Sequence, residues 1–361
     1  MTRLRSLSTE HPHATLSDDD TAALLAALDG GDSTRWRDAV ARTGVRRRSA
    51  VAPAARLPHL GGVGDRHALY RRLAPQLAER VARAALARAG ADVSEVAALV
   101  VASSTGHPVP TLDYHLSTRL GVPATARHLA LTDLGCVGAL RAVATAADLL
   151  HGRAGVALVV AVELSSLWLP TGEVGPDDLR AAMRFGDGAG ALVLDTAATA
   201  GGPRLLAHQS TLWPDSLDAR GVAQTGAGPR HVVSPRLPRA VVANLRRTMT
   251  AFLRAHDVAI ADLAFVAVNP SELDLARAIV SHLDLSPDAI EIPRQVWEQH
   301  GNTLAVGPLH VLRRLAELDT LRDGDLGVIL AVGPGLTCDL MLLRWHHLAV
   351  THHESPQPTE A

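Results

Sequence analysis

Cys136 is the residue with the clearest capacity for chemistry, because it lies where a strand-like segment changes into a helix-like one. Residues 128–150 read HLALTDLGCVGALRAVATAADLL, with a glycine turn at the cysteine and apolar residues at helical spacing after it. We therefore expect Cys136 at or beside a helix N-terminus, where unpaired N–H groups and the helix dipole favour an anion. Such a thiol is expected to have a lowered pKa and to act as a nucleophile. The alternative is a buried structural cysteine, because free cysteine also packs as a small apolar residue.

Two asparagines occupy comparable places. Asn269 directly follows the apolar segment LAFVAV, and Asn302 lies in the turn HGNT before a predicted helix. In open α/β sheets ligands gather at the C-terminal ends of strands, so both asparagines and Cys136 could converge on one pocket. Each also has an ordinary structural explanation, Asn269 as a turn residue before Pro270 and Asn302 as a helix N-cap.

The elements that must position these residues alternate between buried strands and helices. Segments rich in Val and Leu, each continuously apolar, are expected as strands at 96–104, 155–163 and 263–268. With helices between them, they predict a parallel or mixed sheet covered on both faces. The Gly- and Pro-rich segment 213–231 is predicted to be an irregular loop.

The composition limits the class of protein. The chain has 361 residues, 47% of them apolar and 20% charged, which suits a globular protein with a full core. A net charge of −2 without a basic stripe argues against nucleic acid, and no apolar run reaches membrane-spanning length. Cys136 and Cys338 are too few for a disulfide framework, and the N-terminus lacks an apolar signal core, so a cytoplasmic location is expected. The eighteen histidines show no metal-ligand spacing, so no metal is expected.

A weak internal repeat suggests two halves. One glycine turn leads into a strand in GDGAGALVLD, and another does so in GPGLTCDLMLL near the other end of the chain. We expect an N-terminal half over 1–200 that carries the cysteine and a C-terminal half over 201–348 that carries the asparagines. The polar segment 349–361 is expected to be a disordered tail.

Six segments, in order, resemble the type III polyketide synthase (chalcone synthase) family of the thiolase superfamily. TDLGCVGA resembles the active-site segment of that family, and VVASSTGHPVPTLDYHLSTRLGV resembles the stretch before it. The later segments are GRAGVALVVAVELSSL, RFGDGAGALVL, HGNTLAVGPLHVL and AVGPGLTCDLMLL, and TEHPHATLS and VRRRS also fit. The resemblance extends from about residue 5 to 345. It implies the thiolase fold, with five αβαβα layers and two pseudo-repeated halves, and a homodimer.

The resemblance also implies the catalytic residues. Cys136 matches the nucleophile that takes an acyl group from a thioester, and Asn302 matches the family asparagine. The family has a histidine where this chain has Asn269. An asparagine can donate a hydrogen bond to a thioester oxygen, as that histidine does, but it neither ionises nor accepts a proton.

Further positions match residues that shape the substrate site of the family. Phe185 matches the aromatic gate between the CoA tunnel and the cavity, and Val332 stands where an aromatic residue is common, which would widen the pocket. Val109 falls where the family sends a side chain across the dimer interface. Arg42 and Arg46 fall near the residues that hold CoA phosphates, although a solvated basic face explains such a run equally well.

The expected function is that of an acyltransferase that loads an acyl group from CoA on Cys136 and condenses it with malonyl units by decarboxylative Claisen chemistry. Acyl-CoA and malonyl-CoA are then substrates, no cofactor is permanently bound, and an acyl carrier protein is the alternative donor. Two other functions stay open. One is a non-decarboxylating acyltransferase to a hydroxyl, amine or thiol, and the other is a catalytically weak subunit of a heteromeric synthase.

Overall fold

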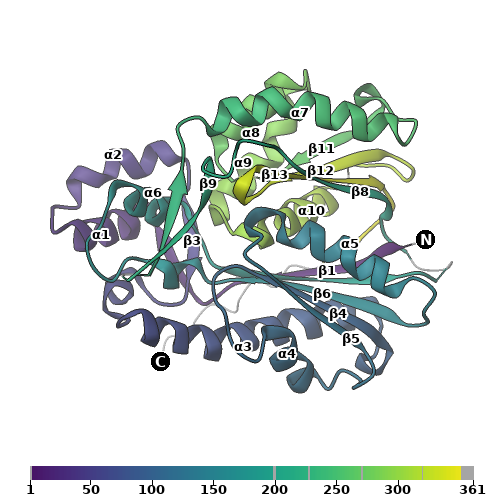
Figure 1. The fold of residues 1–361 in the computed structure, drawn as a ribbon, viewed down its shortest axis with the longest axis horizontal. Helices are drawn as coiled ribbons and strands as arrows, with labels where there is room; N and C mark the ends of the chain where they lie inside the picture. Colours follow the sequence, from purple (N-terminus) through teal and green to yellow (C-terminus); the bar gives the residue numbers. More distant parts are fainter. Residues whose placement is uncertain (1, 198–200, 227, 270, 319, 351–361) are drawn as a thin grey trace.

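The computed structural model describes residues 2–197, 201–226, 228–269, 271–318 and 320–350 (Figure 1). Within these residues one mixed sheet of ten strands has the order β11-β12-β13-β8-β1-β7-β6-β4-β5, with β14 beside β1. Its strands are β1 (Arg3–Glu10), β4 (Val96–Ser103), β5 (Arg127–Thr132), β6 (Val156–Glu163), β7 (Gly188–Asp195), β8 (Arg204–Leu212), β11 (Phe265–Val268), β12 (Leu326–Val332), β13 (Thr337–Arg344) and β14 (Ala349–Val350).

The sheet consists of two similar runs of strands. In one run β5, β4 and β6 are parallel, and β7 and β1 follow antiparallel. In the other run β11 and β12 are parallel, and β13 and β8 follow antiparallel. A single residue pair, Arg3 with Arg204, joins β1 to β8. The strands of the expected halves 1–200 and 201–348 thus follow the same pattern, whereas the division into domains itself stays a prediction.

Helices cover both faces of these runs and also fill the space between them (Figure 1). The helices are α1 (Asp18–Asp29), α2 (Thr34–Thr43), α3 (Val63–Ala89), α4 (Leu112–Leu120), α5 (Gly138–Leu150), α6 (Pro176–Arg184), α7 (Leu237–Arg254), α8 (Leu273–His282), α9 (Glu291–His300) and α10 (Gly307–Leu318). Helices α5 and α10 lie in the middle, α3 and α4 cover one outer face, and α7 and α8 cover the other. The predicted five-layered α/β arrangement is confirmed.

The helices pack closely because their buried faces carry small or branched apolar residues. In α3 the buried residues Ala74, Ala78, Val81, Ala82 and Ala85 recur every three or four positions and face the sheet. The central helices α5 and α10 likewise contribute buried alanine, valine and leucine to one shared core. Such helices can approach a sheet closely, which brings the loops before α5 and α10 into contact.

The predicted irregular loop at 213–231 is wrong. Strands β9 (Arg220–Thr225) and β10 (Gly228–Val233) form an antiparallel hairpin that is a two-stranded sheet of its own. Pro229 in β10 is tolerated because both strands of such a ribbon are edges. A second separate pair consists of β2 (Ala14–Ser17) and β3 (Arg47–Ala50).

The first two residues of the predicted C-terminal tail belong to the main sheet. The backbone of residues 349–350 pairs with β1, while the rest of the predicted tail lies outside the described residues. Among the helices of the described chain, none combines the length and the apolar character that crossing a membrane requires.

Candidate active site

Cys136 lies where the sequence predicts it, directly before a helix. It belongs to the short turn η3 (Gly135–Val137), which continues into α5, and its side chain is only 1% exposed. A Cβ at Gly135, which has φ +52°, would lie 3.0 Å from the Pro334 ring, and one at Gly138 would lie 3.0 Å from the Ala305 side chain. The glycines around the cysteine therefore let loops from the other half pack against it.

Asn302 contacts the cysteine through its amide oxygen. The distance from Cys136 Sγ to Asn302 Oδ1 is 3.7 Å. The same oxygen accepts a hydrogen bond from the backbone N–H of Leu304 at 2.9 Å, and Asn302 Nδ2 donates to the carbonyl of Ser271 at 3.2 Å. Backbone groups thus hold both ends of the Asn302 amide. The hydrogen bond to the following turn does not prevent the same amide oxygen from contacting the thiol.

Asn269 completes the predicted convergence. It follows β11, is 5% exposed, and its backbone N–H donates to the carbonyl of Leu330 at 2.8 Å. Its side chain acts on Cys136 and lowers the pKa of the thiol. A Cβ at Gly307 would overlap Asn269 Oδ1, so this glycine fixes where the amide lies. The opposite atom, Nδ2, is buried without an acceptor in the described part of the chain.

Arg220 is a site residue that the sequence prediction missed. It begins β9, is 9% exposed, and its Nη2 donates to Cys136 Sγ at 3.7 Å. The signal that could have found it is the alternating pattern RGVAQT, followed by a glycine-containing turn and PRHVV, which favours a hairpin.

The expected lowered pKa of Cys136 is wrong, because the pKa is raised instead. Burial raises the pKa of the thiol, and this effect exceeds the lowering by Arg220, Asn302 and Asn269. The Glu163 carboxyl contributes to the rise. Burial raises the pKa of Glu163 itself to about 8, although Ser104 and Thr105 donate hydrogen bonds to it. Glu163 is therefore mostly protonated at neutral pH, so little of its repulsion of a thiolate acts there.

Cys136 lines a cavity of about 620 Å³. Arg220, Phe185, Trp168 and His231 line the same cavity. A second cavity of about 260 Å³ is lined by residues that include Asn302, Arg180, Arg184 and Ser271. Phe185, Arg220, His231 and Val233 contribute to the walls of both cavities. These shared residues mark the boundary between the two spaces.

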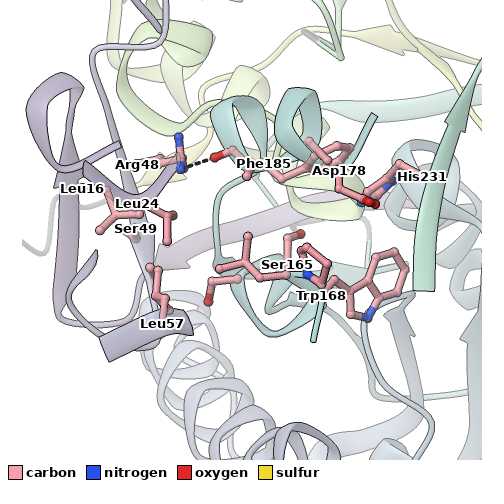
Figure 2. Close-up of a pocket in the computed structure, with 16 residues that line it drawn as sticks. Leu16, Leu24, Arg48, Ser49, Leu57, Ser165, Trp168, Asp178, Phe185 and His231 are labelled. Atoms are coloured by element: carbon pink, nitrogen blue, oxygen red, sulfur yellow. Dashed lines mark hydrogen bonds between the residues drawn. The ribbon is translucent and has the colours of Figure 1, made fainter. Parts of the chain in front are cut away.

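The backbone around Phe185 is held firmly. Gly186 N–H donates to the carbonyl of Asn302 at 3.0 Å, and Asn302 N–H donates to the carbonyl of Arg184 at 2.8 Å. The buried guanidinium of Arg48 donates to the carbonyl of Met183 at 2.9 Å, at the end of α6. Figure 2 shows Phe185, His231 and Trp168 on one side of a smaller pocket and Arg48 on the other. The backbone on both sides of Phe185 is thus hydrogen-bonded to Asn302.

The other predicted substrate residues lie apart from the two cavities. Val109 is 85% exposed in the loop before α4, and Val332 packs in the core beneath α7 and α8. Arg46 forms an exposed ion pair with Asp18 at 3.2 Å, and Arg42 is exposed in α2. The cavities described above are lined by none of these four predicted residues. Their roles stay predictions.

Three histidines from distant parts of the chain form a further cluster. One ring nitrogen from each of His11, His300 and His310 lies within 4.8 Å of the others, so the group could hold a metal ion. The sequence shows no such spacing because the three come from separate elements. The nearby cations Arg47 and Arg313 oppose a bound metal, and burial lowers the pKa of all three rings.

Comparison with known proteins finds two family models in this chain. Residues 53–198 match the N-terminal domain of chalcone and stilbene synthases, and residues 253–345 match the C-terminal domain of 3-oxoacyl-[acyl-carrier-protein] synthase III. A 1,3,6,8-tetrahydroxynaphthalene synthase from Streptomyces peucetius is 30% identical, with 95% of this chain and 93% of that protein aligned. A phloroglucinol synthase from Pseudomonas fluorescens is 30% identical over 85% of this chain and 88% of its own length. The crystal structure of 1,3,6,8-tetrahydroxynaphthalene synthase from Streptomyces coelicolor has the same fold, with a TM-score of 0.89, 24% identity, and coverage of 95% of this chain and 99% of its own.

Proposed function

The chain belongs to the type III polyketide synthase family, and from this premise we propose that it extends an acyl group on Cys136 with malonyl units taken from CoA. In the first step the Cys136 thiolate attacks the carbonyl carbon of an acyl-CoA. The bond from that carbon to the CoA sulfur breaks, and CoA leaves with a proton. The acyl group is then held as a thioester at the floor of the 620 Å³ cavity.

Condensation follows without any resident cofactor. The malonyl thioester loses CO2, and the electron pair of the broken C–C bond forms an enolate. The enolate carbon attacks the acyl carbon, a new C–C bond forms, and Cys136 Sγ leaves as a thiolate. Hydrogen-bond donors that face the enolate oxygen lower the barrier to this step.

The observation that carries this proposal is the buried Nδ2 of Asn269, which has no acceptor in the described part of the chain and lies beside the nucleophile. A buried, unpaired donor is costly unless a bound group accepts its hydrogen bond. A thioester or enolate oxygen supplies that acceptor. Asn269 thus performs the donor role that the resemblance gives to a histidine, and Asn302 contacts the sulfur through its amide oxygen.

The two cavities suit two parts of the substrate. The cavity of about 260 Å³ has Arg180 and Arg184 in its lining, paired with Asp177 and Glu272, and an anionic CoA competes with these acids for the two guanidiniums. The resemblance assigns Arg42 and Arg46 to the CoA phosphates as well. The larger cavity takes the growing chain. Asn302 lines the smaller cavity, Cys136 lines the larger one, and the two residues contact each other. A thioester that enters through the smaller cavity can therefore reach the sulfur in the larger one.

The assembly is part of the same proposal. Val109 is exposed on the loop before α4, where the resemblance expects a side chain that enters the partner's cavity. A homodimer would cover this apolar side chain. Size-exclusion chromatography with light scattering, on the wild type and on Val109→Glu, measures the assembly, and a monomeric wild type would contradict it.

The proposed reaction is tested on the purified protein. Incubation with acyl-CoA should add the acyl mass to the peptide that contains Cys136, and malonyl-CoA should then release CO2 and an extended product. Cys136→Ala should abolish loading. Covalent acylation that persists on another residue would refute the role of Cys136, and acylation without CO2 release would indicate a non-decarboxylating acyltransferase.

A further inference from the structure

We propose that Arg220 is a catalytic residue of this site, as the cation that pairs with the Cys136 thiolate. The inference rests on the proposed function for its role in turnover, but the ion pair itself can be measured without any substrate. The residue comes from a segment for which the sequence predicted only an irregular loop.

Geometry places the guanidinium against the reacting sulfur. Arg220 Nη2 lies 3.7 Å from Cys136 Sγ, within reach of a charge-assisted hydrogen bond to a thiolate. Arg220 is 9% exposed, and its Nη1 has no acceptor among the described residues. An arginine keeps its charge at any pH at which a protein is folded. A buried, unpaired cation is costly, so the site gains most when an anion forms on the adjacent sulfur.

The other groups around Sγ cannot supply this charge. Asn302 presents its amide oxygen to the sulfur, and Asn269 neither ionises nor accepts a proton. Glu163 acts in the opposite direction, because it raises the pKa of the thiol. Among the polar groups of the described residues that act on Cys136, Arg220 is the cation, and after burial it has the largest effect on the pKa.

The pair serves two moments of the proposed reaction. Before loading, the guanidinium stabilises the thiolate that attacks the acyl-CoA carbonyl. During condensation, Cys136 Sγ leaves the acyl carbon as a thiolate, and the same guanidinium stabilises this leaving group. Between these moments the sulfur is uncharged in the thioester. No additional co-reactant is needed, because Arg220 changes neither its protonation nor its bonds.

The position of Arg220 also explains how the charge is held in place. The β9–β10 hairpin is closed by backbone pairing between Arg220 and Val233 and by Ser234 N–H, which donates to the carbonyl of Ala219 at 2.9 Å. Arg220 is therefore the first residue of a hydrogen-bonded strand. A fixed cation stabilises a developing anion without reorganising during the reaction.

The test measures the reactivity of Cys136 against pH. Rates of alkylation by iodoacetamide are determined from about pH 5 to about pH 10, with peptide mass spectrometry to assign the label to Cys136. The variants are Arg220→Met, which removes the charge, and Arg220→Lys, which keeps it. Arg230→Met is the matched control, because Arg230 lies in the same hairpin but pairs with Asp178 instead. Thermal unfolding shows whether each variant is folded.

In Arg220→Met we expect the midpoint of the pH profile to rise by at least about one unit, so that alkylation at pH 7 slows about tenfold. Arg220→Lys should recover part of this shift, and Arg230→Met should match the wild type. A folded Arg220→Met with an unchanged midpoint overturns the ion pair. If Arg220→Met does not fold, Arg220→Gln decides, because it also removes the charge while keeping a polar side chain. A raised midpoint in folded Arg220→Gln supports the ion pair, and an unchanged midpoint overturns it.

The outcomes separate this inference from the proposed function. Alkylation requires no acyl-CoA, so a shifted midpoint supports the ion pair even if the wild type fails to load an acyl group. Normal loading and CO2 release together with an unshifted Arg220→Met profile overturn the ion pair and leave the proposed function standing.

Discussion

The ring of Phe185 stacks on the ring of His231, with 4.1 Å between the ring centroids and 13° between the planes. Phe185 follows α6 and His231 lies in β10, so the stack joins two separate elements across the boundary of the two cavities. Burial, with a further contribution from Arg220, lowers the pKa of His231 to about 4. The His231 ring is therefore uncharged at neutral pH, like the Phe185 ring on which it stacks.

Removal of one ring from this stack should change the size of the product. His231→Ala connects the two cavities more widely, so we expect a distribution shifted toward longer chains, with acyl loading within about tenfold of the wild type. Liquid chromatography with mass spectrometry measures the products. His151→Ala, at an exposed position, is the control. An unchanged distribution in His231→Ala would show that the stack does not limit the chain.

Asn269 should control decarboxylation more than loading. Asn269→Leu removes the donor, so CO2 release from malonyl-CoA should fall by about 10²–10³ while loading on Cys136 continues. Asn269→His should raise decarboxylation if the pocket stays intact, because an imidazole can donate to the oxygen and also stabilise a thiolate. Release of labelled CO2 gives both rates. A rate in Asn269→His that is equal to or below that of the wild type would show that the asparagine is not the limiting defect.

Gly307→Ala should also slow decarboxylation, because it would displace the Asn269 amide. The new Cβ would overlap Asn269 Oδ1, and the amide must move away from the sulfur. Gly307 has ordinary helical backbone angles, φ −52° and ψ −49°, so backbone strain does not contribute. We expect CO2 release to fall at least about tenfold. Gly64→Ala is the matched control, because Gly64 also lies in the first turn of a helix but has open space at its Cβ. Equal rates in the two variants would contradict the positioning role of Gly307.

The cluster of His11, His300 and His310 should make the fold sensitive to acid. Burial lowers the pKa of His11 from 6.5 to about 4 and lowers those of His300 and His310 well below 6.5. Between the unfolded pKa of 6.5 and the lower folded pKa values, the unfolded chain binds protons that the folded chain does not. The contribution of the three histidines to the free energy of unfolding is therefore complete above pH 6.5 and is lost as the pH falls below it. Each histidine that stays neutral in the fold contributes up to about 1.4 kcal/mol per pH unit to this loss.

Urea unfolding at a series of pH values measures this dependence. His310→Leu should lose less stability between pH 7 and pH 5 than the wild type, because one buried base is absent. His151→Leu, at an exposed position, should follow the wild type. The same pH slope in all three proteins would contradict the contribution of the cluster.

The sequence allowed the layered fold and three site residues to be predicted. Cys136 and Asn269 each follow a parallel strand, where an α/β fold gathers its ligands, although their strands β5 and β11 lie at opposite ends of the strand order. They meet because the two runs of strands share the central layer of α5 and α10. Asn302 joins them because it precedes α10, the partner of α5 in the central layer. The alternation of strands and helices could be predicted from local patterns, whereas the five layers were implied by the resemblance to the type III polyketide synthase family.

The pattern of RGVAQT and PRHVV indicates a hairpin, but it does not by itself place Arg220 and His231 at the site. They reach the site from a hairpin whose position is set by long-range packing, and its Gly- and Pro-rich composition resembles that of a loop. The raised pKa of Cys136 was missed for a similar reason. The effect of a helix terminus can be read from a local pattern, whereas burial of the sulfur and the proximity of Glu163 depend on the assembled tertiary structure.

The β9–β10 hairpin, a sheet separate from the main one, has an evolutionary consequence. It carries both Arg220, against Cys136 Sγ, and His231, against the ring of Phe185. A change within this short stretch can therefore alter which products form and how reactive the thiol is, while the ten-stranded scaffold stays as it is. Exchange of residues 219–234 between relatives should therefore transfer both traits together.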